Sequence, residues 1–290
     1  MKFSEQKKLL ASAVNTARAA GDLMRRHQHK AKRVHEVSRY DIRLKLDIRC
    51  QKLIEKILRS AFPDIPVLGE EGVLGDMEAA QRWVVDPIDG TVNFARGIPH
   101  ACVSIALQVR PRWGGRPREP DSNSAHRSRV CSLHHEDIYE TIIGVVYDPF
   151  CDELWTAIRG QPARLNGRVV KVSQCRQLSE AIVMIGFAKS KATMELMLPV
   201  FNRLAWQTHK VRITGAAALA LTYVASGRFD AYVEAGIHLW DIAAGGLILE
   251  CAGGQFIAEP TDSEHCFRML ASNGKLRPRL EMPDYTQRHK

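Results

Sequence analysis

The sequence predicts a mixed α/β fold, and three observations lead to this prediction. Apolar residues recur at helical spacing between residues 5 and 62. Runs rich in β-branched residues occupy residues 101–109 and 141–147. From about residue 179 onward, strand-like and helix-like segments alternate, which is typical of an α/β layer.

Two helices are expected near the N-terminus. The first covers residues 5–28, where leucine, alanine, valine and methionine recur on one helical face. The second begins at Asp47 and ends before Pro63, because proline cannot continue a helix. Asp47 fits this helix start as a cap, a role that contributes roughly 1 kcal/mol to stability.

A strand, an acidic turn and a helix start are expected within residues 83–94. The two adjacent valines of this segment suit a strand that is buried on both faces. Pro87 predicts that the strand ends at Asp86, because proline fixes its own φ and restricts the residue before it. Thr91 is expected to begin a short helix after the turn.

A shorter strand, residues 67–69, runs into the paired acids Glu70 and Glu71. Such a pair is usually a solvated turn. Here it precedes the acidic turn at 86–89 along the chain, which favours a shared site.

The middle of the chain predicts β structure. Residues 101–109 and 141–147 are expected to pair, and residues 110–137 between them form a polar, arginine-rich surface insertion. Two further strands, 154–158 and 168–172, follow, and Asn166-Gly167 is a hairpin turn signal.

The C-terminal half predicts alternating elements. Strands are expected at 182–185, 211–213 and 229–233, and helices at 193–205, 215–226 and 242–251. We therefore divide the chain into residues 1–178, which carry the main acidic motif, and residues 179–290, which carry Glu234 and Asp241.

Composition excludes some classes of protein. No apolar run approaches the roughly 20 residues that span a bilayer, and no signal peptide is evident, so we expect no membrane association and a cytoplasmic location. The seven scattered cysteines favour reduced thiols over disulfides or a zinc site. The net charge of +9 suits an anionic partner, but no nucleic-acid-binding motif accompanies it, and we do not expect nucleic-acid binding.

The acidic turn is the main candidate for chemistry. Asp86 and Asp89 are close enough to present both carboxylates to one point. Gly90 lets the backbone approach a ligand, and Thr91 lies where N–H groups at a helix start can hold a phosphate. Hard oxygen ligands beside an anion site indicate Mg²⁺-assisted phosphate chemistry. A purely structural Asp-Gly turn is the alternative.

The motifs together resemble the inositol monophosphatase family. The match rests on Gly69-Glu70-Glu71, on the D-P-I-D-G-T run from Asp86 to Thr91 with Asn93-Phe94, and on Trp240-Asp241 through Gly254. This resemblance covers about residues 5 to 275. It implies a layered α/β/α/β/α sandwich of the inositol monophosphatase and fructose-1,6-bisphosphatase type, and a homodimer.

The resemblance also implies a metal cluster. Glu70, Asp86 and the carbonyl of Ile88 would hold one Mg²⁺, and Asp86, Asp89 and Asp241 a second. A third ion is expected near Glu70, so that two to three ions bind, with Mn²⁺ as an alternative. Lithium sensitivity is a further family expectation.

The implied reaction is hydrolysis of a phosphate monoester by in-line attack of a metal-activated water. The resemblance assigns phosphate binding to Gly90 and Thr91. It assigns activation of the water to Thr91 with Asp47, and gives Glu70 a catalytic role.

The implied substrate is inositol monophosphate or a similar small polyol or sugar phosphate. Its contacts would be Asp89, Asp241, Glu234 and the segment Gly215, Ala216 and Ala217, where Ala216 replaces a threonine common in relatives. Histidinol phosphate, fructose 1,6-bisphosphate and a 3′-phosphoadenosine nucleotide are alternatives. In a different class, the protein would be an inactive binding or regulatory protein with a basic surface.

Overall fold

The computed structural model describes residues 1–28, 34–37, 42–111, 139–188 and 190–283. The surface insertion predicted at 110–137 therefore lies almost entirely outside the described residues. Among the described residues, we find no helix that combines the length and the apolar character of a membrane span. The six cysteines that the structure describes form no disulfide.

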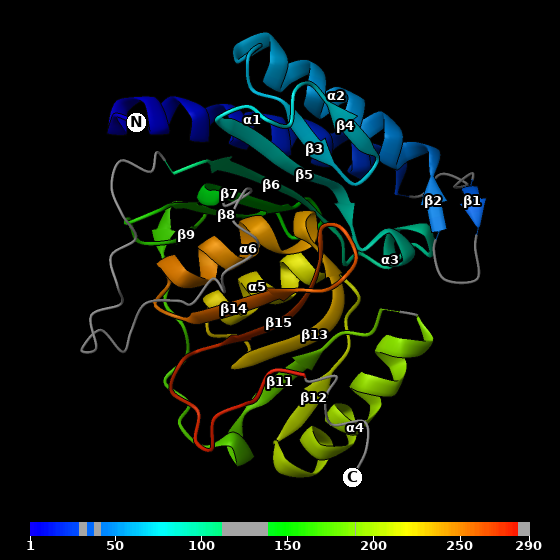
Figure 1. Ribbon diagram of the computed structural model, residues 1–290, viewed down its shortest axis with the longest axis vertical. Helices are drawn as coiled ribbons and strands as arrows, with labels where there is room; N and C mark the ends of the chain where they lie inside the picture. The colour runs from blue at the N-terminus through cyan, green and yellow to red at the C-terminus, as the bar shows by residue number, and fades with distance from the viewer. Residues whose placement is uncertain (29–33, 38–41, 112–138, 189, 284–290) are drawn as a thin grey trace.

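Two large sheets form within these residues (Figure 1). The larger sheet is eight-stranded and runs, from edge to edge, through β10 (Arg168–Val169), β9 (Arg164–Leu165), β8 (Glu153–Ile158), β7 (Glu140–Asp148), β6 (Cys102–Val109), β5 (Gln81–Asp89), β3 (Val67–Gly69) and β4 (Gly72–Leu74). All its neighbouring strands are antiparallel except β3 and β5.

The smaller sheet is five-stranded and runs through β12 (Lys210–Arg212), β11 (Ile182–Ile185), β13 (Ala231–His238), β15 (Cys266–Ser272) and β14 (Gln255–Pro260). Its first three strands are parallel and its last two pairs are antiparallel. Two short strands, β1 (Val34–Val37) and β2 (Ile42–Leu44), pair with each other.

The helices complete a layered arrangement (Figure 1). They are α1 (Phe3–His27), α2 (Lys45–Ala61), α3 (Thr91–Ala95), α4 (Lys191–Gln207), α5 (Ala217–Ala225) and α6 (Leu239–Cys251), with a 3₁₀ turn at Leu178–Glu180. Helices α1 and α2 cover the outer face of the larger sheet, α5 and α6 lie between the sheets, and α4 covers the outer face of the smaller sheet. This confirms the predicted α/β/α/β/α sandwich.

Strand β5 shows why the larger sheet is buried on both faces. Trp83 and Val85 pack in the apolar cluster beneath α1 and α2. Val84, pointing the opposite way, packs in the cluster that contains α5 and α6. Successive side chains of a strand point to opposite faces, so this apolar run serves two cores.

The end of β5 corrects one prediction. The strand continues past Asp86 to Asp89, where a step of three residues is matched by a step of two on β6, from Ser104 to Cys102. This is a β-bulge, which re-aims side chains and tolerates a proline because the extra residue needs no ladder hydrogen bond. Pro87 thus lies within the strand instead of ending it.

Other element bounds differ from the sequence predictions. Helix α6 begins at Leu239 instead of residue 242, and β13 extends to His238 instead of residue 233. No strand was predicted after residue 251, yet β14 and β15 form a hairpin there. Their residues are mostly only partly buried, so hydrophobic patterning gave a weak signal.

Small residues let α6 approach the larger sheet closely. A Cβ placed on Gly144 of β7 would meet the carbonyl oxygen of Ala244 at 2.7 Å. On the other side, a Cβ on Gly245 would meet Leu221 of α5 at 2.7 Å. The cluster of small residues in α6 therefore serves close packing.

The replacement Gly144→Ala is expected to destabilise the protein by roughly 1–3 kcal/mol, because the added methyl group meets backbone atoms that cannot rotate away. The measurement is the urea midpoint of the variant against that of the unaltered protein. An unchanged midpoint with an unchanged denaturant slope would show that the contact between sheet and helix is looser than described.

Candidate metal centre

Three carboxylates from two distant parts of the chain meet beside the bulge. Asp86 and Asp89 come from the end of β5, and Asp241 comes from the first turn of α6. One ligand oxygen of each lies within 4.8 Å of the others. Asp86 and Asp89 are buried, with 2% and 6% of their surface exposed.

The electrostatics of this cluster fit a cation. Burial, followed by the charges of Glu70, Asp89 and Asp241, raises the pKa of Asp86 well above its usual range. Burial raises the pKa of Asp89 to about 6, and burial with the charge of Asp89 raises that of Asp241 to about 7. Crowded buried carboxylates either take up protons or need a cation to stay ionised. An all-oxygen donor set suits a hard divalent ion such as Mg²⁺.

Asp89 also anchors the start of α5. Its two oxygens accept hydrogen bonds from the N–H groups of Ala217, at 3.0 Å, and Ala218, at 2.7 Å. The thiol of Cys102 donates to the same carboxylate at 3.5 Å. A carboxylate has about four acceptor sites, so these bonds leave room for a cation. Sequence reasoning assigned no role to Cys102.

Asp241 is held by a capping box. Its Oδ2 accepts a hydrogen bond from the N–H of His238 at 2.9 Å. Ser104 on β6 donates to the carbonyl of Trp240 at 3.1 Å, which ties this helix start to the strand beside Asp86. Asp241 is therefore both a cap and a member of the cluster.

The turn after Asp89 is the segment predicted to bind phosphate. Gly90 adopts φ 88°, a left-handed conformation that favours glycine, and precedes α3. The hydroxyl of Thr91 donates to the carbonyl of Ile88 at 3.0 Å, and Ile88 N–H donates to Asp86 at 2.9 Å. The Ile88 carbonyl has a second lone pair for another partner.

Asn93 links this turn to the segment between β12 and α5. Its side-chain amide donates to the carbonyls of His100, at 2.9 Å, and Thr214, at 2.7 Å. Together with Asp89, it holds the segment 214–218 over the turn. Asn93 was part of the sequence motif, but its bridging role needed the fold.

Glu70 lies beside the cluster but outside the closest trio. It follows β3, its N–H donates to the carbonyl of Val85 at 3.2 Å, and its charge raises the pKa of Asp86. Gln51 of α2 steadies the neighbouring turn by accepting a bond from Glu71 N–H at 2.9 Å. Glu70 therefore lies near Asp86, and its role as a metal ligand stays a prediction.

Asp47 is buried in the first turn of α2, and α2 packs against β5. Helix α2 begins at Lys45, two residues before the predicted start, so Asp47 lies inside the helix instead of capping it. Its pairing with Thr91 stays a prediction.

The predicted substrate contacts occupy different environments. Glu234 lies on β13, and burial with the charges of Asp241 and Asp89 raises its pKa to about 8. Gly215 is exposed, Ala216 is buried, and the N–H of Ala217 is already bonded to Asp89. Their contacts with a substrate stay predictions.

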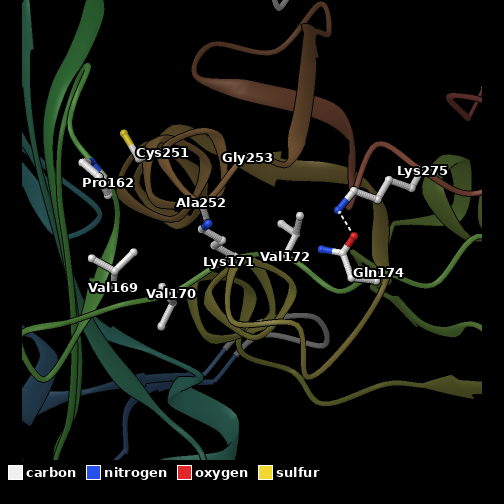
Figure 2. A pocket seen from close by; sticks show the side chains of 10 residues that line it. All are labelled: Pro162, Val169, Val170, Lys171, Val172, Gln174, Cys251, Ala252, Gly253 and Lys275. Carbon is white, nitrogen blue, oxygen red and sulfur yellow. Dashed lines mark hydrogen bonds between the residues drawn. The ribbon is translucent and has the colours of Figure 1, made fainter.

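A separate cavity of about 360 Å³ lies at the other end of α6 (Figure 2). An apolar wall that includes Val170, Val172 and Cys251 faces the side chains of Gln174 and Lys275, which are hydrogen bonded to each other at 3.0 Å. Asp241 lies in the first turn of α6 and Cys251 ends the helix, so this cavity is distinct from the carboxylate cluster.

Comparison with known proteins decides the family. The model of the inositol monophosphatase family matches residues 5–114 and 138–274. The chain belongs to the inositol monophosphatase family. The unmatched residues 115–137 fall within the predicted insertion, so the family pattern continues on both sides of it.

Individual relatives agree with this membership. The chain is 38% identical to Nus factor SuhB of Xylella fastidiosa over 252 residues, covering 86% of this chain and 81% of that protein. It is 33% identical to inositol monophosphatase 2 of Solanum lycopersicum over 276 residues, covering 91% and 93%. The solved inositol monophosphatase from Anabaena superimposes with a TM-score of 0.73 at 31% identity, covering 93% and 92%. Membership supports phosphatase activity on a phosphate ester.

Proposed function

We propose that this protein is a Mg²⁺-dependent hydrolase of small phosphate monoesters, with inositol monophosphate as the leading substrate. The observation that carries the proposal is the carboxylate trio of Asp86, Asp89 and Asp241, with ligand oxygens within 4.8 Å of one another; Asp86 and Asp89 are buried and Asp241 is partly buried. Family membership supports the same chemistry.

The proposed ligands form two overlapping sets. Glu70, Asp86 and the Ile88 carbonyl would hold one ion, and Asp86 with Asp89 and Asp241 a second; a third ion is proposed near Glu70. Mg²⁺ bound there would supply Lewis-acid stabilisation of phosphate charge and lower the pKa of a bound water. Mn²⁺ has the same preference for oxygen ligands.

The protein's own groups would position the reactants. The N–H groups at Gly90 and Thr91 point from a helix start and suit phosphate oxygens. The Thr91 hydroxyl would orient the attacking water, with Asp47 accepting its proton through Thr91, and Glu70 would assist. Water would displace the alcohol directly, without a phosphoenzyme.

Glu234 is the proposed contact for substrate hydroxyls, since a carboxylate accepts hydrogen bonds from a polyol. Asp89, Asp241 and the segment 215–217 would complete this side of the site. The homodimer, the cytoplasmic location, lithium sensitivity and the lack of nucleic-acid binding also stay predictions.

A second candidate is a binding or regulatory role without catalysis. Relatives from several bacteria carry the name Nus factor SuhB, and this name mentions no enzymatic activity. The net charge of +9 would suit an acidic partner. The complete carboxylate trio favours the enzyme, because a binding protein has no need to keep three acids this close together.

A substrate panel separates these candidates. We expect the purified protein to release phosphate from inositol 1-phosphate with Mg²⁺, faster than from histidinol phosphate, fructose 1,6-bisphosphate or 3′-phosphoadenosine nucleotides. Each assay measures inorganic phosphate, with and without Li⁺, and with EDTA as the metal-free control. Absence of phosphate release from every substrate would favour the non-catalytic role.

A further inference from the structure

Glu234 is held from its own strand. Tyr232 and Glu234 are two residues apart on β13, so their side chains lie on one face of the sheet. The hydroxyl of Tyr232 donates a hydrogen bond to Oε2 of Glu234. Tyr232 is 3% exposed, and burial with the charge of Glu234 raises its pKa well above its usual range, so it stays a protonated donor.

The neighbouring strand leaves space for the same carboxylate. Gly186 follows the end of β11, and its N–H donates to the carbonyl of Val233 at 3.0 Å. A Cβ placed on Gly186 would overlap the carboxylate of Glu234. Any side chain at this position would therefore push Glu234 out of its present place.

The held carboxylate still has an open acceptor. Within the part of the chain that the structure describes, the bond from Tyr232 is the one hydrogen bond that the Glu234 carboxylate makes. Its other oxygen, Oε1, is thus available to a ligand. Glu234 lies on β13, which leads directly into α6 and Asp241, and the charges of Asp241 and Asp89 raise its pKa.

We propose that Tyr232 and Gly186 are positioning residues that determine substrate preference: they fix the Glu234 carboxylate so that Oε1 accepts a hydroxyl of a cyclic polyol phosphate. This inference rests on the proposed function. It assigns selection of the alcohol part to β11 and β13, and leaves phosphate binding to the turn at Gly90.

The test compares two substrates. Inositol 1-phosphate has ring hydroxyls for Glu234, whereas p-nitrophenyl phosphate has none. In Tyr232→Phe, kcat/KM for inositol 1-phosphate is expected to fall about fivefold or more, the size of effect that follows loss of one hydrogen bond. For p-nitrophenyl phosphate, kcat/KM should change by less than about twofold, because this substrate has no hydroxyl that Glu234 could contact.

Gly186→Ala provides an independent variant, and the same loss of preference is expected because the methyl group displaces Glu234. The matched control is Tyr147→Phe, which removes a tyrosine hydroxyl bonded to Asp152 at 2.9 Å, outside the site. It should leave the preference unchanged. Thermal unfolding identifies any variant that does not fold.

The outcomes separate the two proposals. An unchanged ratio between the substrates in the folded variants, or an equal loss for both, would overturn the positioning role while leaving the phosphatase in place. If the unaltered protein hydrolyses neither substrate, the proposed function fails first and this inference fails with it.

Discussion

Replacing Asp89 by asparagine is expected to lower Mg²⁺-dependent turnover by more than about 100-fold, beyond what loss of an outer-shell partner costs at a metal site, because Asp89 is a proposed direct ligand. The reason is that Asp89 is one of three carboxylates converging within 4.8 Å. The measurement is kcat for inositol 1-phosphate at saturating Mg²⁺, together with Mg²⁺ affinity by calorimetry.

The hydrogen bonds of Asp89 add an expectation about stability. Both oxygens accept backbone N–H groups at the start of α5, and an asparagine would turn its own NH₂ toward one of those donors. We therefore expect Asp89→Asn to fold with a loss of roughly 1–3 kcal/mol.

Asp241→Asn is the cleaner companion variant. Its amide oxygen can still accept the bond from His238 N–H, so the capping box survives while the negative charge is lost. A similar loss of turnover is expected with little change in stability. If both variants kept substantial Mg²⁺-dependent activity, the carboxylate trio would not be the catalytic centre.

The second prediction with a large expected effect concerns how pH and Mg²⁺ change the thermal stability of the protein. The pKa values of Asp89, Asp241 and Glu234 are raised in the folded protein, to about 6, 7 and 8. A folded state that holds protons more tightly than the unfolded state loses stability as pH rises through these values. The metal-free protein is therefore expected to be more stable near pH 5 than near pH 8, by several degrees in Tm.

Mg²⁺ should counteract the loss of stability that the metal-free protein shows as pH rises. A cation favours the ionised carboxylates, so the rise in Tm on adding Mg²⁺ is expected to grow from about pH 5 to about pH 8. The measurement is thermal unfolding in EDTA and in excess Mg²⁺ across that range. Asp241→Asn is the control and should show a smaller rise. A Tm shift from Mg²⁺ that is independent of pH would contradict a metal site made of these carboxylates.

Local sequence patterns determined most of the elements and the first half of the site. Helical spacing predicted α1 and α2, because helix periodicity depends on neighbours within one or two turns. The spacing of Asp86 and Asp89 predicted that their carboxylates converge, because residues three apart in a turn are close in space whatever the rest of the fold. The short helix at Thr91 and the hairpin turn at Asn166-Gly167 could also be predicted. Helix starts and tight turns depend on the backbone geometry of a few neighbouring residues.

Membership of a family with known motifs carried the prediction further, to Asp241. Without that resemblance, an acidic residue at a helix start reads as a cap, and the capping box with His238 shows that this reading is also correct. The sequence around Asp241 does not show that this helix start, and not another, will lie beside Asp86.

Only the tertiary structure decided how the site is assembled. The bulge at Pro87 depends on the register of β5 against β6, and a strand's register is set by its partner. The bonds from Asp89 to α5 join residues 128 and 129 positions apart. The space at Gly186 that receives Glu234 exists because β11 and β13 lie side by side. Contacts of this kind are made through space, so spacing along the chain cannot reveal them.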